Sequence, residues 1–89
     1  MLNLNIVSNN IMNLRKATLL SRKELAMLLG VTRNEIVSWE NMSKAPEEIS
    51  IRKLLKIANI KRELFIEQKL SVKEIFQAIE DGKIEKCLY

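Results

Sequence analysis

Residues 21–41, SRKELAMLLGVTRNEIVSWEN, contain two short helical patterns, and each pattern opens with its own capping signal. Ser21 is followed three residues later by Glu24, and Thr32 is followed three residues later by Glu35. In such a capping box the hydroxyl oxygen accepts a hydrogen bond from a free backbone N–H, and the carboxylate accepts one from the N–H of the cap residue. We therefore expect two helix starts that lie eleven residues apart.

Apolar residues and a glycine indicate how these two helices meet. The first pattern carries an apolar stripe of Leu25, Ala26, Leu28 and Leu29. The second carries an apolar edge at i, i+3 spacing, formed by Ile36 and Trp39. Gly30 follows the first stripe, where a left-handed conformation ends a helix at little cost. Val31 can then pack into the angle between the helices. The stretch is typical of a helix, a tight turn and a second helix.

The composition favours a single domain made of helices around a small core. A chain of 89 residues is too short for two independent cores. Apolar residues make up 47% and aromatic residues only 4%, so the core should be rich in Leu and Ile. Two Gly and one Pro, with 29% charged residues, favour an all-α globule over a disordered chain. The excess positive charge of +4 lies within residues 1–60, whereas the positive and negative side chains of residues 61–89 balance.

The same composition argues against a metal site, a membrane segment and a catalytic site. One Cys and no His leave no intrachain disulfide and no Cys/His zinc site. The longest apolar run in the middle of the chain, residues 25–29, is far too short to span a membrane. The sequence has no Gly-rich phosphate loop and no nucleophile beside a base. We expect a cytoplasmic protein that is not an enzyme and that binds no cofactor.

The first residues allow more than one interpretation. The opening MLNLNIV alternates apolar residues with Asn in a two-residue period, which favours a short extended arm. A frayed helix start or a disordered terminus is equally compatible with it. Ser8 is the expected cap of a first helix that runs to about Ala17 and buries Ile11 and Leu14, with Val7 packing back onto it.

Two further helices are expected directly after the paired ones. Residues 41–46 form a polar loop that ends in a proline, which resists continuation of a helix. A fourth helix lies within residues 47–59, where an i, i+3, i+4, i+7 stripe is formed by Ile51, Leu54, Leu55 and Ala58. A fifth helix covers roughly residues 61–69 and uses Leu64 and Phe65 as its apolar contacts.

A third capping box, Ser71 with Glu74, opens a sixth helix. We expect this helix to end at Gly82, because glycine commonly follows the last helical residue. It is amphipathic and neutral in net charge, and its apolar residues are Val72, Ile75, Phe76 and Ile79. Residues 83–89 then form a short tail.

The order of these elements and the residues within them resemble the Cro/C1-type helix-turn-helix family, the phage-repressor-like class of bacterial and phage DNA-binding regulators. The resemblance covers roughly residues 11–65. Matches to the family pattern LSQ-x-ELA-x-x-LGVS-x-x-x-I-x-x-WE are Leu20, Ser21, Glu24, Leu25, Ala26, Leu29, Gly30, Val31, Thr32, Ile36, Trp39, Glu40 and Asn41. The resemblance implies an all-α fold, in which residues 11–69 form a compact five-helix repressor-like DNA-binding domain. Residues 1–10 would be an arm and the start of helix one, and residues 70–89 an additional C-terminal helix and tail.

By this resemblance, Arg33, Asn34 and Ser38 on the second helix of the pair would contact DNA bases. Their chemistry agrees, because Arg makes paired hydrogen bonds to guanine and Asn to adenine in the major groove. The alternative is that Arg33 and Asn34 are solvated residues of a first helical turn. Glu35 could accept from cytosine, but its spacing from Thr32 favours capping.

The resemblance also implies contacts to the DNA backbone and two structural features. The residues expected at the backbone are Ser21, Arg22, Thr32, Asn41, Ser43 and Lys44. Arg22 stands where the family usually has a Gln, and arginine can still bind phosphate through its charge and donors. Lys44 could equally be a solvated loop residue. Glu40 is expected to pair with Arg15, and Trp39 is expected to cover the edge of the core.

We therefore expect a sequence-specific regulator of transcription that binds double-stranded DNA, most simply a repressor acting as a homodimer on a two-fold symmetric operator. The sixth helix and the tail are the candidate dimer surface, with Val72, Ile75, Phe76, Ile79, Leu88 and Tyr89. The alternative for this helix is that it closes the core of the monomer. The alternative function is a protein-interaction module, such as the antitoxin of a toxin–antitoxin pair, that grips a partner through this helix or through the N-terminal arm.

Overall fold

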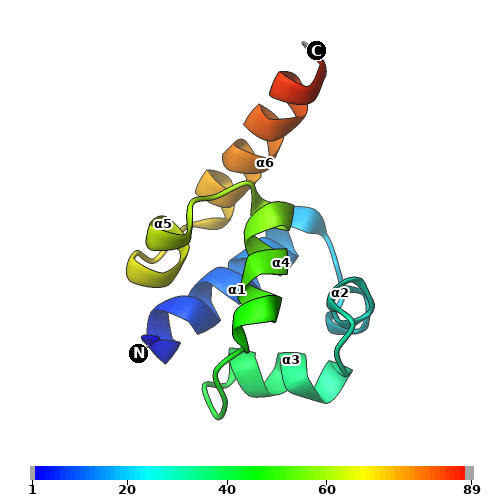
Figure 1. Cartoon of the computed structure of the whole chain (residues 1–89), viewed down its shortest axis with the longest axis vertical. Helices are drawn as coiled ribbons and strands as arrows, with labels where there is room; N and C mark the ends of the chain where they lie inside the picture. Colours follow the sequence, from blue (N-terminus) through cyan, green and yellow to red (C-terminus); the bar gives the residue numbers. More distant parts are fainter. Residues whose placement is uncertain (1, 88–89) are drawn as a thin grey trace.

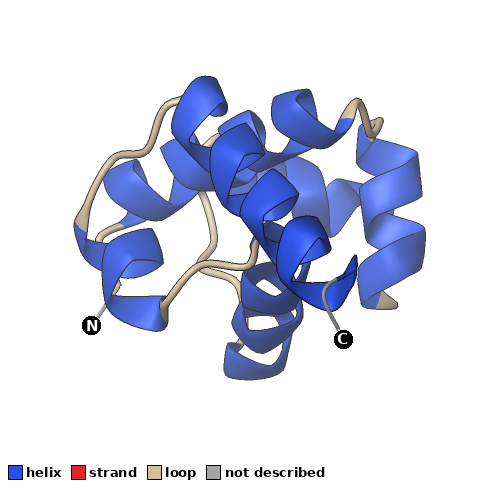
Figure 2. Cartoon of the chain, turned by 90° about the horizontal axis from the view of Figure 1, so that it is seen from above, coloured by secondary structure: helices blue, strands red, loops and turns tan. Residues whose placement is uncertain are grey.

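The computed structural model describes residues 2–87, and side chains in the last helix as far as residue 83. This part of the chain is all-helical, as the sequence predicts, and contains no strand (Figures 1 and 2). The helices are α1 (Leu4–Thr18), α2 (Arg22–Leu29), α3 (Arg33–Glu40), α4 (Glu48–Ala58), α5 (Arg62–Glu67) and α6 (Val72–Cys87). None of the helices in the described part is both long and apolar enough to cross a membrane.

Helix α1 begins earlier than the sequence predicts, and the extended arm is wrong for Leu4–Val7. The side chain of Asn3 caps the helix by accepting hydrogen bonds from the backbone N–H groups of the second and third residues after it. Ser8 is therefore not a cap but a buried residue inside α1, and Val7 is 1% exposed in the core. A two-residue alternation over seven residues is a weak signal, and a side-chain cap together with core burial decides the outcome.

The two paired helices start and stop largely as predicted. Ser21 and Glu24 form a complete capping box, and Gly30 ends α2 with a positive φ of 72°. The Thr32 hydroxyl accepts from the Glu35 N–H at 3.2 Å, but among the hydrogen bonds of the described residues none joins the Glu35 carboxylate to Thr32. The second box is therefore only half formed. Two apolar predictions also differ, because Leu28 is 59% and Leu64 46% exposed, whereas their neighbours Leu29 and Phe65 are buried.

Helix α6 passes through Gly82 instead of ending there. Its capping box, Ser71 with Glu74, forms as predicted. Gly82 faces the side chain of Asn59, the residue that ends α4 with φ 56°, and a Cβ on Gly82 would lie 2.8 Å from Asn59 Nδ2. Asn59 Nδ2 also donates to the Ala78 carbonyl at 2.9 Å. Glycine therefore serves here as a site of close approach between α4 and α6.

Buried side chains from all six helices form one core. Its fully buried members include Ile11, Leu14, Leu25, Ile36, Leu54, Phe65 and Ile75. Because Ile75 belongs to this core, part of α6 closes the monomer. Phe76 beside it is 50% exposed, while the predicted dimer residues Leu88 and Tyr89 lie outside the described residues.

Asparagines of α1 hold the segment between α5 and α6. The amide of Asn10, which is fully buried, donates to the carbonyls of Phe65 at 2.6 Å and Gln68 at 2.8 Å. Its oxygen accepts from the N–H of Leu70 at 2.7 Å. The carbonyl of Leu70 accepts two more amide hydrogen bonds, from Asn9 and Asn13. These contacts fix the start of α6 to α1.

Helices α3 and α6 occupy opposite ends of the molecule (Figure 1). Helix α3 lies across the lower end of the view, and the C-terminal half of α6 extends beyond the other helices at the upper end. The longest dimension of the molecule is 40 Å. The helix expected to read DNA is therefore remote from the far end of α6.

Candidate nucleic-acid interface

Helix α3 buries one side and exposes a polar one. Ile36 and Trp39 are 0% and 3% exposed, so they fix the inner side of the helix against the core. Arg33 and Asn34, in the first turn, are exposed. Ser38 is half-buried, and its hydroxyl donates to the Asn34 carbonyl at 2.9 Å, which leaves its oxygen lone pairs as acceptors. The outer side of α3 thus offers donors from Arg33 and Asn34 and an acceptor one turn later.

The cap residues Ser21 and Thr32 keep a hydrogen-bond donor available. Each hydroxyl oxygen accepts from a backbone N–H, at 3.1 Å from Glu24 and 3.2 Å from Glu35. Because a hydroxyl can accept and donate at once, each proton can still point to an anion. Both residues are exposed, and each sits at the positive end of a helix. These are the groups that a phosphate oxygen requires.

Glu24 belongs to the same capping box and carries a perturbed carboxyl group. Hydrogen bonds from Ser21, that of its backbone N–H first and that of its side chain second, lower the pKa of Glu24 below its ordinary value of 4.5. The bond from the Ser21 N–H measures 2.9 Å. The ionised carboxylate is therefore favoured by the folded helix end.

The loop after α3 is folded back onto the end of that helix. The backbone N–H groups of Ser43 and Lys44 donate to the Ser38 carbonyl at 3.0 and 3.3 Å. The Asn41 side-chain oxygen accepts from the backbone N–H and the hydroxyl of Ser43, whereas the amide nitrogen of this exposed residue makes no hydrogen bond among the described residues. Met42 reaches this turn with a positive φ of 65°. The donors exposed in this loop are thus the amide of Asn41 and the ammonium of Lys44.

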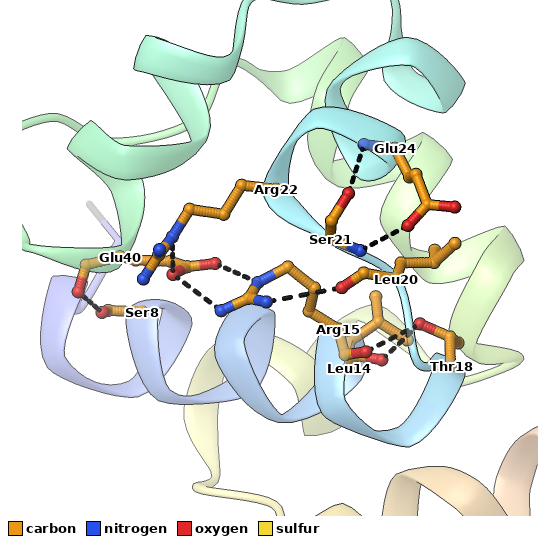
Figure 3. Close-up of polar contacts among 9 residues, drawn as sticks. All are labelled: Ser8, Leu14, Arg15, Thr18, Leu20, Ser21, Arg22, Glu24 and Glu40. Carbon is orange, nitrogen blue, oxygen red and sulfur yellow. Dashed lines mark hydrogen bonds and ion pairs between the residues drawn. The ribbon is translucent and has the colours of Figure 1, made fainter.

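Glu40, the last residue of α3, binds two arginines at once (Figure 3). Arg15 of α1 donates from Nε to Glu40 Oε2 at 2.8 Å and from Nη2 to Oε1 at 3.3 Å, so the pair that the resemblance implied is present. Arg22 of α2 donates from Nε to Glu40 Oε1 at 2.9 Å. The Ser8 hydroxyl donates to the Glu40 backbone carbonyl at 2.6 Å. One residue therefore joins α1, α2 and α3.

The sequence does not predict the contact between Arg22 and Glu40. The two residues are 18 positions apart, and the resemblance implies Arg15 as the partner of Glu40. The available signal was the arginine at a position where the family usually has a Gln. The contact brings the start of α2 beside the end of α3. Arg22 and Asn41, both expected to contact the DNA backbone, therefore belong to parts of the chain that lie next to each other in space.

A hollow of about 530 Å³ lies beside α3, between the turn that precedes it and the start of α4. Its charged lining consists of two carboxylates and two ammonium groups, from Glu35, Glu47, Lys44 and Lys53. Lys53 already donates to the Leu29 carbonyl at 2.9 Å and so caps the end of α2. Across the described residues, no three His, Cys, Asp or Glu side chains gather in a way that could hold a metal ion.

Comparison with known proteins identifies the family to which the chain is similar. The family model described as Helix-turn-helix matches residues 11–65, which is more than half of the chain and includes α2, α3 and α4 entirely. No curated protein and no solved structure matches the chain.

Proposed function

Because the chain belongs to the Cro/C1-type helix-turn-helix family, we propose that it is a sequence-specific regulator that binds double-stranded DNA with α3 in the major groove and represses transcription. The family is one of DNA-binding regulators of transcription. The observation that carries the proposal is the exposed first turn of α3, where Arg33 and Asn34 stand in the second helix of the matched motif. No cofactor and no catalytic step are part of the proposal.

The two kinds of DNA contact fall to different residues. Arg33 and Asn34 read base edges, and Ser38 accepts a hydrogen bond from a base one turn further along. Contacts to the phosphates are made by the caps, the arginine of α2 and the loop after α3, namely Ser21, Thr32, Arg22, Asn41, Ser43 and Lys44. The hydroxyl of Ser43 must turn away from Asn41 before it can donate to a phosphate. Phosphate contacts orient the protein, and base contacts select the sequence.

We further propose that the protein acts as a homodimer joined along the side of α6 that carries Phe76. Half-sites on a symmetric operator lie about 34 Å apart. Because α3 and the far end of α6 lie at opposite ends of a 40 Å molecule, a dimer joined end to end would separate the two α3 helices by much more than that. A side-by-side contact through the half-exposed Phe76 avoids this separation. The same exposed ring is what favours the second candidate, a module that binds another protein.

Selection from a random duplex library, followed by binding measurements at several salt concentrations, tests the DNA-binding function. Arg33→Ala should lower the preference for the selected sequence by about 1–3 kcal/mol at one base pair. Lys44→Ala should weaken binding to all duplexes alike and reduce the slope of log K against log salt by about 0.9. Lys73→Ala, which removes an exposed charge from α6, is the control and should change neither. If Arg33→Ala and Lys44→Ala both bind as the wild type does, the proposed DNA surface is wrong.

A further inference from the structure

The two arginines that share Glu40 differ in how fully the protein engages them. All three guanidinium nitrogens of Arg15 are bonded, two to Glu40 and Nη1 to the Leu20 carbonyl at 3.4 Å, and its side chain is 18% exposed. Arg22 bonds through Nε alone among the described residues, and its side chain is 41% exposed. Arg15 is therefore built into the fold, whereas Arg22 keeps its two terminal nitrogens for another ligand.

The charges at this place do not balance. Two guanidinium groups face one carboxylate, and the Glu40 side chain is only 5% exposed. One positive charge is left over, and it lies at the first residue of α2, where the helix dipole is also positive. The exposed Ser21 hydroxyl, with its free proton, stands next to it in the chain. An anion with several acceptor oxygens would complete the hydrogen bonds of this group.

Glu40 fixes the orientation of the free nitrogens. A guanidinium group is planar, so a bond at Nε determines the plane in which the two Nη groups lie. A lysine at the same position could not do this, because its ammonium group is not planar and its three donors rotate, so that a bond to the carboxylate does not fix where the other donors point. Since Glu40 is the last residue of α3, whatever Arg22 binds is linked through one carboxylate to the helix that carries Arg33 and Asn34.

We propose that Glu40 is a positioning residue that holds Arg22 for a phosphate of the DNA backbone, and thereby couples phosphate binding at α2 to the placement of α3. This inference rests on the proposed DNA-binding function. Ordered donors bind with less loss of side-chain freedom than mobile ones. The carboxylate thus contributes to DNA affinity although it is itself a negative group that would repel phosphate.

A double-mutant cycle with Arg22→Gln, Glu40→Gln and the combination tests the inference, using the duplex selected above and a series of salt concentrations. Arg22→Gln should reduce the slope of log K against log salt by about 0.9, because one phosphate contact is lost. Glu40→Gln should weaken binding about three- to tenfold in the wild type and less than about twofold in the Arg22→Gln protein. Lys23→Gln, an exposed neighbour on α2, should leave the slope within about 0.3 of the wild type.

Two results would overturn the inference while leaving the proposed function in place. One is an equal effect of Glu40→Gln with and without Arg22, which would mean that Glu40 acts only through Arg15 and the fold. The other is wild-type affinity in Arg22→Lys, which keeps the charge but loses the orienting bond; this variant decides the matter if Glu40→Gln does not fold. We expect Arg22→Lys to bind about three- to tenfold more weakly with an unchanged salt slope. Failure of the wild type to bind any duplex would instead overturn the proposed function itself.

Discussion

Replacing Asn10 with alanine tests how much the asparagines of α1 contribute to stability. The change removes three hydrogen bonds to backbone groups, of 2.6, 2.8 and 2.7 Å, and one of 3.0 Å from the Asn9 amide, at a side chain that is fully buried. At about 1 kcal/mol net for each of the three bonds to the backbone, Asn10→Ala should lower the free energy of unfolding by about 3 kcal/mol. For a domain of this size that corresponds to a decrease in Tm of about 12–24 °C. Urea unfolding followed by circular dichroism measures the first quantity and a thermal melt the second.

Two other asparagines of α1 serve as controls. Asn5→Ala changes an exposed side chain that makes no hydrogen bond among the described residues, and it should alter stability by less than about 0.5 kcal/mol. Asn13→Ala removes one bond of 2.7 Å to the Leu70 carbonyl and should cost about 1 kcal/mol. If Asn10→Ala costs no more than Asn13→Ala, the hydrogen bonds of Asn10 do not stabilise the junction of α5 and α6.

Three further outcomes are expected. Leu19→Gly should stabilise the protein by about 1 kcal/mol in urea unfolding, because Leu19 has φ 59° and is 90% exposed; a loss of stability would contradict this. Since Ser21 lowers the pKa of Glu24, the ionised carboxylate stabilises the folded state above its ordinary pKa of 4.5, and this contribution is lost as the pH falls through the lower folded value. The difference in Tm between the wild type and Glu24→Gln should therefore shrink on acidification, and a constant difference would refute the assignment. Phe76→Asp should convert a dimer to a monomer in sedimentation experiments, whereas Gln77→Asp, at an exposed neighbour, should not.

Local rules predicted the paired helices well because their signals lie within a few residues of each other. Capping at Ser21 and Ser71 depends on residues three positions apart, and Gly30 ends α2 by its own backbone conformation. The same type of rule failed at Gly82, where the side chain of Asn59 approaches the helix from α4. A glycine that allows close approach and a glycine that ends a helix look alike in the sequence.

The polar contacts of the candidate interface were harder to predict, because they join residues that are far apart in the chain. The bond between Arg22 and Glu40 could not be read from spacing, since it depends on the angle at which α2 meets α3. Ser8 is buried with its hydroxyl bonded to the Glu40 carbonyl, which belongs to a residue 32 positions further along the chain. The family resemblance predicts the pair of Arg15 and Glu40. It does not predict the partner of Arg22, because the family usually has a different residue at that position.

The hydrogen bonds of Asn10 have a consequence for the order in which the chain folds. The donor and acceptor groups they join are 55–60 residues apart, so most of the chain must be present before they can form. Closing so long a loop is entropically costly, and contacts of this range slow folding relative to those within neighbouring helices. We expect α2 and α3 to pair early and the α1 junction with Leu70 to close late. A nascent chain on the ribosome would then form the two helices proposed to contact DNA before α6 packs against α1 and α4.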